Sequence, residues 1–404
     1  MTSVVEQRMN FGAASAAVGR EWRDAPWQAA LRKRAVELAN RLDWPDSRAE
    51  RPWKYYDAAR IGLSPETPLA DVSVTISGDT GGHVTRFSEA AGAAADTIAR
   101  TIGSVVAAET NRLTALHYAF LRDGVLVNVP ANTELAAPIH LRRHVEQPGV
   151  STPHTLIVTG ANSRVTVVQE YSSSDEAIVA LPVAEIIPGP GSEVAYYCIH
   201  RWGSRTRAFA HQRFLGSERD AAFRNLHIVL GGEVVKGHLE STLAGRGTSS
   251  ELLGVAYGTG TTHADFYTLQ DHIGPDTRSD LVYKSALRDS SKAVYYGLTR
   301  VGLGAKNADA NQENRNLILS KAAKADSDPV LEILTSDIIR ASHGATAGPV
   351  DQEQLYYLQT RGIRPADAEA MLVRAFLEGV LGRVPGEAPR QELEAALEAA
   401  LERD

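Results

Sequence analysis

The feature that most constrains this fold is a long series of short β-type segments between turns, which extends from about residue 135 to residue 345. β-Branched and aromatic residues dominate these segments, and no stretch long enough for a helix interrupts them. A turn signal that begins with glycine recurs before several segments, as Gly160-Ala-Asn-Ser163, Gly191-Ser-Glu193, Gly216-Ser-Glu218 and Gly247-Thr-Ser-Ser-Glu251. These glycines are 31, 25 and 31 residues apart, a spacing of the order of one coil of a β-solenoid. The pattern disfavours a β–α–β fold, leaves a β-sandwich or a β-helix, and favours the β-helix modestly.

A helical pattern precedes this β-region. We expect an N-terminal helical region and linker over residues 1–90, with helices over 14–20 and 27–42 and a Gly- and Pro-rich connecting segment over 60–90. The core domain is expected over residues 91–350. It begins with an alanine-rich helical stretch, and its β pattern is clearest from residue 135.

The helical period returns after the β-region, which predicts a C-terminal helical domain over residues 351–404. Asp351 is suited to cap the first helix, Gly362 to take the left-handed position after it, and Pro365 to begin the next. The apolar stripe expected on that second helix consists of Ala368, Met371, Leu372, Ala375, Phe376 and Val380. The chain is therefore predicted to be mainly β, with helices on both sides of a long β-domain.

Composition excludes several classes of protein. Hydrophobic residues make up 43% of the 404 residues, which is enough for a sizeable core. The net charge of −7 argues against binding to nucleic acid or to an anionic membrane. No apolar run approaches the roughly 18 to 20 residues of a membrane span, and residues 1–10 contain no apolar signal core, so we expect a cytoplasmic chain.

Cys198 is the one cysteine of the chain, so neither an intramolecular disulfide nor a cysteine-cluster metal site can form. It lies in the apolar, strand-like run Val194–Ile199, which predicts a buried and inert thiol.

Motifs with chemical potential are scarce. The sequence Gly258-Thr-Gly260 lacks a third glycine and a following helix, and is interpreted as a turn rather than a phosphate loop. No Walker A motif and no Gly-x-Ser-x-Gly elbow occur, so we expect neither ATP hydrolysis nor this type of serine chemistry. His263, Asp265, Asp271 and His272 are close in sequence, but alternation along a strand would send them to opposite faces. They are interpreted as polar residues on strand surfaces and turns.

His343 is the histidine with the most suggestive surroundings. It lies in Ala341-Ser-His-Gly-Ala-Thr-Ala-Gly348, where the β pattern ends and the helical pattern begins. The small neighbours leave room for another chain to approach, and a neutral imidazole can bind iron or zinc. From the residues alone, a structural histidine and a metal ligand both stay open, with the structural role favoured.

Five blocks within 55 residues resemble the C-terminal signature of the SufB/SufD family, which belongs to the SUF machinery for iron–sulfur cluster assembly. They are Asp309-Ala-Asn-Gln-Glu-Asn-Arg-Asn-Leu-Ile-Leu-Ser320, Pro329-Val-Leu-Glu-Ile333, Ser342-His-Gly-Ala-Thr346, Leu355-Tyr-Tyr-Leu358 and Arg361-Gly-Ile363. The sequences Trp44-Pro45 and Pro52-Trp53-Lys54-Tyr55 resemble the helical head of SufD. The scarcity of cysteine favours the SufD type over SufB. The sequence departs from many relatives at Ala341, where they carry a cysteine.

The resemblance implies a right-handed parallel β-helix core with helical flanks. It also implies a complex with SufB and two copies of the SufC ATPase, in which the β-helix pairs with SufB and the C-terminal helices dock SufC. The expected docking residues are Leu355, Tyr356, Tyr357, Arg361, Gly362 and Ile363. A transient iron–sulfur cluster is expected at the SufB junction with His343 as a ligand, and no cofactor is expected on the isolated chain. The chain would then be a non-catalytic assembly subunit.

Three alternatives stay open. A SufB-like scaffold would need a reactive cysteine, and a SufD-like homodimer would form through a self-complementary β-edge. A β-helix carbohydrate-active enzyme, a hydrolase or lyase, would need clustered carboxylates, and the β-region contains no Asp-Asp pair.

Overall fold

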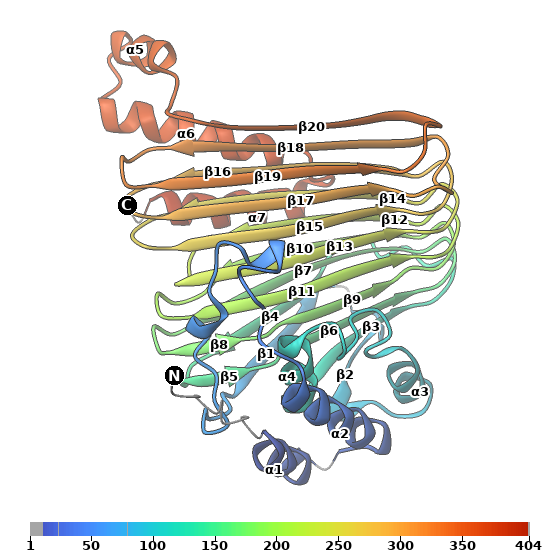
Figure 1. Ribbon diagram of the computed structural model, residues 1–404. Coiled ribbons are helices and arrows are strands. Elements are labelled where there is room, and N and C mark those ends of the chain that lie inside the picture. Colours follow the sequence, from blue (N-terminus) through green and yellow to red (C-terminus); the bar gives the residue numbers. More distant parts are fainter. Residues whose placement is uncertain (1–10, 23, 79, 403–404) are drawn as a thin grey trace, which may run out of the picture.

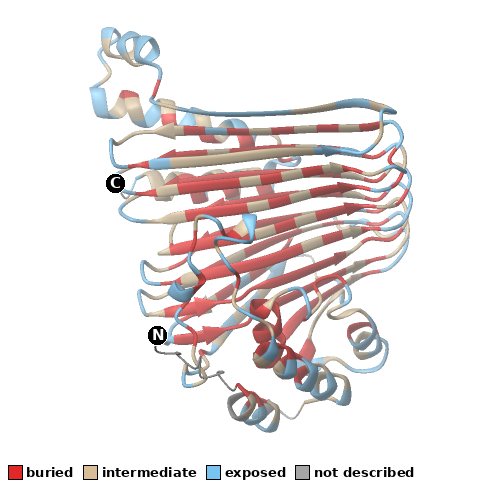
Figure 2. Ribbon diagram, in the orientation of Figure 1, coloured by how far each residue is buried: buried red, intermediate tan, exposed pale blue. Residues whose placement is uncertain are grey.

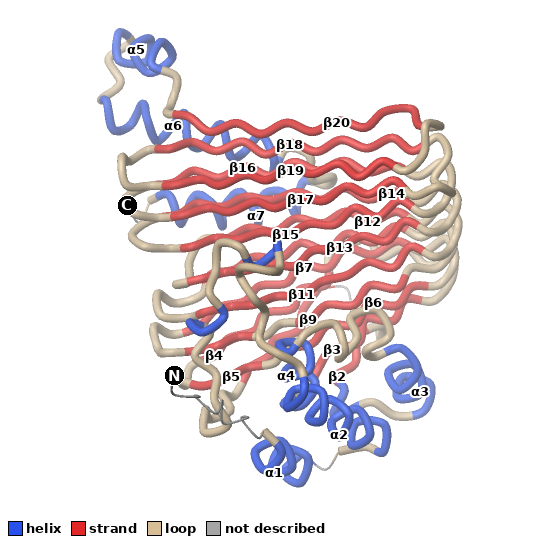
Figure 3. Tube along the Cα trace, viewed as in Figure 1, coloured by secondary structure: helices blue, strands red, loops and turns tan. Residues whose placement is uncertain are grey.

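The β-type segments form a parallel β-solenoid in the computed structural model, which describes residues 11–22, 24–78 and 80–402 (Figure 1). The absence of a signal core was inferred from residues 1–10, which lie outside this description. Helices accompany the solenoid at its N-terminal and C-terminal ends (Figure 3). None of the described helices is long and apolar enough to cross a membrane. The sequence-based choice of a β-helix over a sandwich is confirmed, as is the mainly β class.

Two sheets make up the walls of the solenoid, and each coil contributes one strand to each sheet. The nine-stranded sheet consists, in order, of β1 (Val72–Gly78), β4 (Ile139–Val145), β7 (Arg164–Ser173), β10 (Glu193–Arg201), β12 (Ala222–Val229), β14 (Ser249–Gly258), β16 (Arg278–Leu287), β18 (Ala308–Ile318) and β20 (Ile338–Gly348). The eleven-stranded sheet contains β19 (Lys324–Ile333), β17 (Lys292–Val301), β15 (His263–His272), β13 (Val234–Leu243), β11 (Arg207–Gly216), β9 (Val183–Ile187), β6 (His154–Thr159), β3 (Gly124–Val129) and β2 (Val84–Arg86), with β5 (Gly149–Ser151) and β8 (Ile178–Ala180) beside this path.

One corner of the solenoid repeats with the regularity that the turn signals predicted. Each of seven successive coils places one residue with positive φ there: Asn132, Asn162, Gly191, Asp220, Gly247, Asp276 and Asn307. The backbone N–H of each donates to a carbonyl in the turn of the next coil, at 2.7 to 3.1 Å. Asn, Asp and Gly are the residues that tolerate this left-handed conformation most readily. The four predicted signals therefore mark one corner in consecutive coils.

The space between the sheets is filled by inward-facing apolar side chains such as Val167, Leu239 and Leu281. Buried residues alternate with less buried ones along β4 and β18, as expected of strands with one face towards the interior. Register partners on β11, β13, β15, β17 and β19 are 27, 29, 29 and 32 residues apart. These distances give the length of one coil.

The first two N-terminal helices follow the prediction closely, whereas the alanine-rich stretch after residue 90 contains two separate helices. The four helices are α1 (Gly12–Trp22), α2 (Pro26–Arg41), α3 (Gly92–Thr101) and α4 (Arg112–Phe120), with short 3₁₀ turns at Arg51–Trp53, Ala58–Arg60 and Phe87–Glu89. The interpretation of residues 60–90 as purely connecting was wrong, because β1 and β2 lie there. β1 pairs antiparallel with β4, and β2 pairs antiparallel with β3. The alternation of Val72, Val74 and Ile76 was the overlooked signal.

A strap formed by residues 44–63 crosses the outer face of the eleven-stranded sheet (Figure 1). Trp53 stacks on Phe209 there, and its ring lies 5.0 Å from the ammonium group of Lys236. Lys236 also donates to the carbonyl of Pro52 and forms an ion pair of 2.8 Å with Asp265. Both charged side chains are almost completely buried, so the strap covers a salt bridge on the sheet.

Removing the acidic partner of this pair is expected to destabilise the protein. In Asp265→Ala the ammonium of Lys236 would stay buried without a counter-ion, which should lower the free energy of unfolding by about 3 to 5 kcal/mol. Urea unfolding followed by far-UV circular dichroism measures the change. The double variant Lys236→Met/Asp265→Leu removes both charges and should recover most of the stability. An unchanged midpoint in Asp265→Ala would show that the pair carries no net stability.

The C-terminal helices are α5 (Gln352–Thr360), α6 (Pro365–Leu381) and α7 (Glu387–Leu401). The predicted signals are confirmed, because Asp351 accepts from two backbone N–H groups of α5, Gly362 has a φ of +86°, and Pro365 begins α6. The helices α6 and α7 cover the outer face of the nine-stranded sheet. The predicted stripe of α6 is correct only in part, because Val373 and Leu377 are buried, whereas Met371 and Ala375 are exposed.

Candidate functional site

His343 lies on β20, the last strand of the nine-stranded sheet. Within the described part of the chain, β20 pairs with β18 only, so its other edge has no strand beside it. β19 ends the second sheet at the same end of the solenoid. Figure 2 shows β20 as a largely exposed strand above the buried interior. The C-terminal end of the solenoid therefore presents two strand edges, and unpaired edges are templates for another chain.

The register gives the direction of the His343 side chain. Its partner on β18 is Gln312, which is buried and bonded across the interior to Thr299 Oγ1 and the carbonyl of Gly297. Residues in register on neighbouring parallel strands face the same side of the sheet, so His343 belongs to the inner wall. No further coil covers this wall, and the imidazole is exposed at the open end.

The neighbours of His343 leave space around it, as the sequence predicted. Ala341, Ala345 and Ala347 share its face of β20. A Cβ added at Gly344 would meet no atom within 4 Å. Its imidazole is therefore the only long side chain on the inner face between residues 341 and 347, in the orientation that a ligand at a junction would need.

The predicted docking residues lie together on an exposed element. Leu355, Tyr356 and Tyr357 belong to α5, none of whose residues is buried, and Arg361, Gly362 and Ile363 follow it directly. Tyr356 is 70% exposed and Tyr357 is 56% exposed. Arg361 donates to the Tyr357 hydroxyl at 3.0 Å, with its guanidinium 5.2 Å from the ring centre. Figure 1 shows α5 projecting beyond the solenoid, next to the end that carries β20.

Exposed apolar residues at the same end were missed in the sequence analysis. Leu303, Leu334 and Ile339 are 75%, 51% and 70% exposed, and Ile333 is 42% exposed. They lie at the ends of β19 and β20 and at the adjacent corner. The sequence does contain an indication of this apolar surface, in the adjacent pairs Ile333-Leu334 and Ile338-Ile339 and in Leu303 between two glycines. Large apolar groups gathered at one end are typical of an interaction surface.

Cys198 is buried, as predicted, and it forms a cluster with two buried histidines. Its sulfur lies 3.3 Å from Nε2 of His200, and the same nitrogen lies 3.3 Å from Nδ1 of His227. The ligand atoms of the three residues lie within 4.8 Å of one another. The sequence analysis missed this cluster, because His200 is two residues away and His227 comes from the next coil.

The direction of the hydrogen bonds argues against a metal at this cluster. Trp202 Nε1–H donates to Nδ1 of His200 at 3.1 Å, so the proton of the neutral imidazole lies on Nε2. That N–H donates towards Cys198 and His227, and His227 Nε2–H donates in turn to Gln212 Oε1 at 3.0 Å. A metal on Nε2 of His200 would displace the proton to Nδ1, which already accepts from Trp202.

Burial keeps the cluster uncharged. It lowers the pKa of His200 to about 3 and also lowers the pKa of His227. It raises the pKa of the Cys198 thiol far above its usual range. A protonated, inaccessible thiol is a poor nucleophile and a poor ligand, so the cluster is a neutral hydrogen-bond network within the core.

The remaining candidate motifs have structural roles. Asp265 pairs with Lys236, and Asp271 pairs with Arg300, with oxygen–nitrogen distances of 2.6 and 2.9 Å. His272 points inwards and bonds to two hydroxyl groups. The alternation argument holds only in part, because His263, Asp265 and Asp271 share the outer face of β15 and only His272 faces inwards; the four residues do not form a metal-binding group. Gly260 has a φ of +57° in the turn between β14 and β15, which confirms the turn interpretation.

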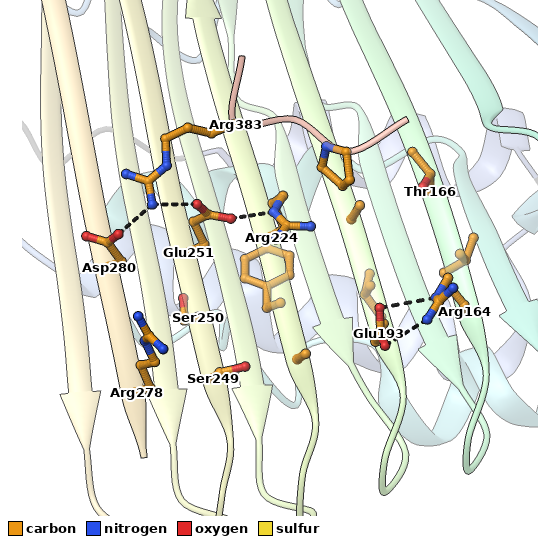
Figure 4. Close-up of a pocket in the computed structure, with 16 residues that line it drawn as sticks. Arg164, Thr166, Glu193, Arg224, Ser249, Ser250, Glu251, Arg278, Asp280 and Arg383 are labelled. Carbon is orange, nitrogen blue, oxygen red and sulfur yellow. Dashed lines mark hydrogen bonds and ion pairs between the residues drawn. The ribbon is translucent and has the colours of Figure 1, made fainter. Parts of the chain in front are cut away.

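A charged hollow of about 320 Å³ lies on the outer face of the nine-stranded sheet, beneath the connection between α6 and α7 (Figure 4). Arg383 from this connection pairs with Glu251 at 2.7 Å and with Asp280, and Glu251 also pairs with Arg224. At the other side of the hollow, Arg164 and Glu193 pair with each other (Figure 4). Arg383 therefore anchors the C-terminal helices to the sheet, and each carboxylate of the lining is paired with an arginine, whereas Arg278 pairs at 3.9 Å with Asp309 outside the hollow.

Comparison with known proteins agrees with this geometry. The family model for the SUF system FeS cluster assembly SufBD core domain matches residues 142–376, which cover the solenoid from β4 to α6. The iron–sulfur cluster assembly protein SufD of Bacillus subtilis is 29% identical over 293 residues, which are 71% of this chain and 66%, just under two thirds, of that protein. A SufBD family protein of Mycobacterium tuberculosis is 30% identical over 305 residues, covering 72% and 75% of the two chains. One from Mycobacterium leprae is 29% identical over 362 residues, covering 86% and 88%.

The matched region contains six of the seven corner positions, the edge strand β20 and the exposed helix α5, so the resemblance inferred from the five C-terminal blocks is confirmed. This chain belongs to the SufBD family of SUF-system iron–sulfur cluster assembly proteins.

Proposed function

We propose that this chain is a SufD-type, non-catalytic subunit of a cytoplasmic SUF complex. It pairs with a SufB subunit through the C-terminal end of the solenoid and docks a SufC ATPase through α5. A cluster under assembly is the cargo of this complex. It would be held transiently at the SufB junction, with His343 as the ligand from this chain.

The observation that carries the proposal is the position of His343 at the uncovered end of the solenoid. Two strand edges, a group of exposed apolar side chains and an inward-facing imidazole coincide there. Pairing with a second solenoid would satisfy the free edges and bury the apolar groups. The imidazole would then lie between the two chains. One imidazole is a weaker and more readily protonated ligand than a thiolate, which suits a site from which a cluster must leave.

The unpaired edge of β20 also supports a second candidate, a homodimer of this chain in the absence of SufB. A self-complementary contact needs the same surface on both copies, and an edge strand provides one. A SufB-like scaffold is less well supported, because the thiol of Cys198 is buried and its pKa is raised. The carbohydrate-enzyme alternative finds no support in the charged hollow, where the carboxylates of Glu193, Glu251 and Asp280 are each paired with arginine.

The test of the proposal is co-purification from cells that express the tagged chain together with SufB and SufC. The wild-type chain should retain both partners. Tyr356→Ala/Arg361→Ala should lose SufC and keep SufB, because tyrosine and arginine are favoured anchors at interface centres and both side chains are exposed here. Melting temperature should be unchanged.

Point variants are preferable to truncation after Val350, because α6 and α7 cover the nine-stranded sheet and their removal would expose its apolar face. Glu353→Ala, an exposed change in the first turn of α5, serves as the matched control. If the double variant still retains SufC, the SufC-binding site is not on α5. If the wild-type chain does not retain SufB, the proposal that this chain is a SufD-type subunit is wrong.

A further inference from the structure

The interior of the solenoid opens at its N-terminal end into a pocket of about 180 Å³. β1 and β4 form one wall, and the start of β3 with the segment that precedes it forms another. The walls are largely apolar and include Leu69, Ala70, Val72, Val74, Val125 and Val150. For comparison, an apolar cavity of about 150 Å³ accepts benzene. The pocket is therefore large enough for a small organic molecule.

A buried guanidinium lines this pocket. Arg143 of β4 is 2% exposed, and its Nη1 donates to Thr155 Oγ1 and Gln169 Oε1, both at 2.7 Å. Its Nη2 donates to the carbonyl of His154 at 2.7 Å. Among the residues that the structure describes, no carboxylate pairs with this guanidinium. Three of its five N–H groups are thus engaged by neutral acceptors, which do not cancel its charge, and the other two can donate to a ligand.

Two other buried cations of this chain, Arg32 and Lys236, do have a carboxylate partner. Arg32 is paired with Asp24 at 2.6 Å, and Lys236 is paired with Asp265 at 2.8 Å. A buried charge without a partner is costly, and folded proteins compensate it. Arg143, which has no carboxylate partner among the described residues, lines an open apolar pocket. An anion that enters this pocket could provide the negative charge that Arg143 lacks.

The acidic groups of the pocket are already engaged. Asp123 pairs with Arg86 at 3.0 Å, and Asp71 pairs with Arg122. The lining thus contains three arginines and two aspartates, and Arg143 accounts for the excess positive charge. A ligand that neutralises this charge must be a monoanion.

Glu185 is a buried carboxylate on the far side of His154, and it is also engaged. His154 Nε2 lies 3.3 Å from its Oε1. The backbone N–H groups of Gly103, Val105 and Val106 donate to it at 2.7 to 3.0 Å. Among the ion pairs of the described residues, Glu185 is joined to His154 and not to Arg143.

We propose that this pocket binds a small organic carboxylate with a compact apolar body, such as an aromatic or branched-chain acid. The carboxylate would pair with Arg143 at the inner end, and the body would fill the space between the valine side chains of β1 and β3. Charge-assisted bonds from arginine to carboxylate are among the strongest in proteins, and the apolar walls add selectivity against inorganic anions. This site is at the opposite end of the solenoid from His343 and does not depend on the assembly role.

The test uses the full chain, with benzoate as the probe and isothermal titration as the measurement. Benzoate should bind the wild-type chain and raise its melting temperature. Benzamide, which has the same shape but no charge, and sulfate, which has charge but no apolar body, should both bind at least about tenfold more weakly. Equal binding of benzoate and benzamide, or no binding of benzoate, would overturn the proposal.

Two variants locate the site. Arg143→Met should abolish the preference for benzoate over benzamide. Because this change also leaves Gln169 and Thr155 without their donor, a second variant keeps Arg143 and fills the pocket instead. Val74→Trp on β1, which is in register with Arg143, should abolish benzoate binding while the chain keeps its β-type circular dichroism. Unchanged affinity in a folded Val74→Trp chain would place the benzoate elsewhere and reject this site.

Discussion

Replacing His343 by alanine is expected to reduce cluster formation by the assembled complex roughly tenfold or more, with no loss of the complex itself. The reduction follows from the loss of one ligand, since even changes that only disturb a ligand's surroundings cost about 10- to 100-fold in metal affinity. Folding should not change, because the imidazole is exposed at the end of the solenoid. Cluster transfer to an acceptor protein and the melting temperature of the complex are the two measurements.

The controls for this experiment lie on the same strand. Thr346→Ala is an equally exposed change on β20, in register with Arg315 rather than with the inward-facing Gln312, and should leave cluster yield unchanged. His343→Cys should recover part of the yield, because a thiolate also binds iron, with slower release. A normal yield in His343→Ala would reject the ligand role, and a lowered melting temperature would indicate a structural role instead.

Placing charges at the C-terminal end of the solenoid is expected to prevent pairing with SufB. The variant Leu334→Glu/Ile339→Glu introduces two carboxylates where the proposed contact would bury them without partners. A cost of about 3 kcal/mol corresponds to an increase in Kd of about a hundredfold. Stability of the isolated chain should change by less than about 0.5 kcal/mol per site, because both side chains are largely exposed. Titration calorimetry with purified SufB measures the affinity.

Met371→Glu is the matched control for this second experiment, because Met371 is a half-exposed apolar residue on α6. It should leave SufB affinity unchanged. Size-exclusion chromatography of the isolated chain addresses the homodimer, which uses the same surface and should dissociate in the double variant. If the double variant binds SufB with wild-type affinity, the contact with SufB does not lie at this end of the solenoid.

The local parts of the fold could be predicted from the sequence. The corner repeat was visible in its glycine signals, and the true positions are more regular than the glycines, because Asn162 and Asp220 perform the same backbone role. The cap at Asp351 and the stop at Gly362 are also local features, and both were correct. These features depend on the conformational preferences of single residues, which a sequence displays directly.

The missed features depend on contacts between distant residues. The antiparallel pairing of β1 with β4 joins residues about 65 positions apart, and the burial of Lys236 depends on a strap more than 180 residues earlier in the chain. The position of His343 at a junction was inferred from resemblance, whereas its inward direction required the register with Gln312. Arg143 gave no signal in the sequence, because the lack of a counter-ion is a property of the folded interior.

The two ends of the solenoid differ, and under the proposed pairing with SufB this difference would limit the stoichiometry of assembly. The short antiparallel strands β1 and β2 terminate the N-terminal side, and the helices α1 to α4 lie beside it (Figure 1). Parallel coils end without such a terminus at β19 and β20. The edges of β1 and β2 are also unpaired among the described strands, but they are shorter, so the proposed contact uses only the end formed by β19 and β20; a solenoid that binds through one end can form a closed pair but cannot polymerise. Under the proposed pairing, the exposed edge of β20 would therefore bind one partner without leading to fibre growth.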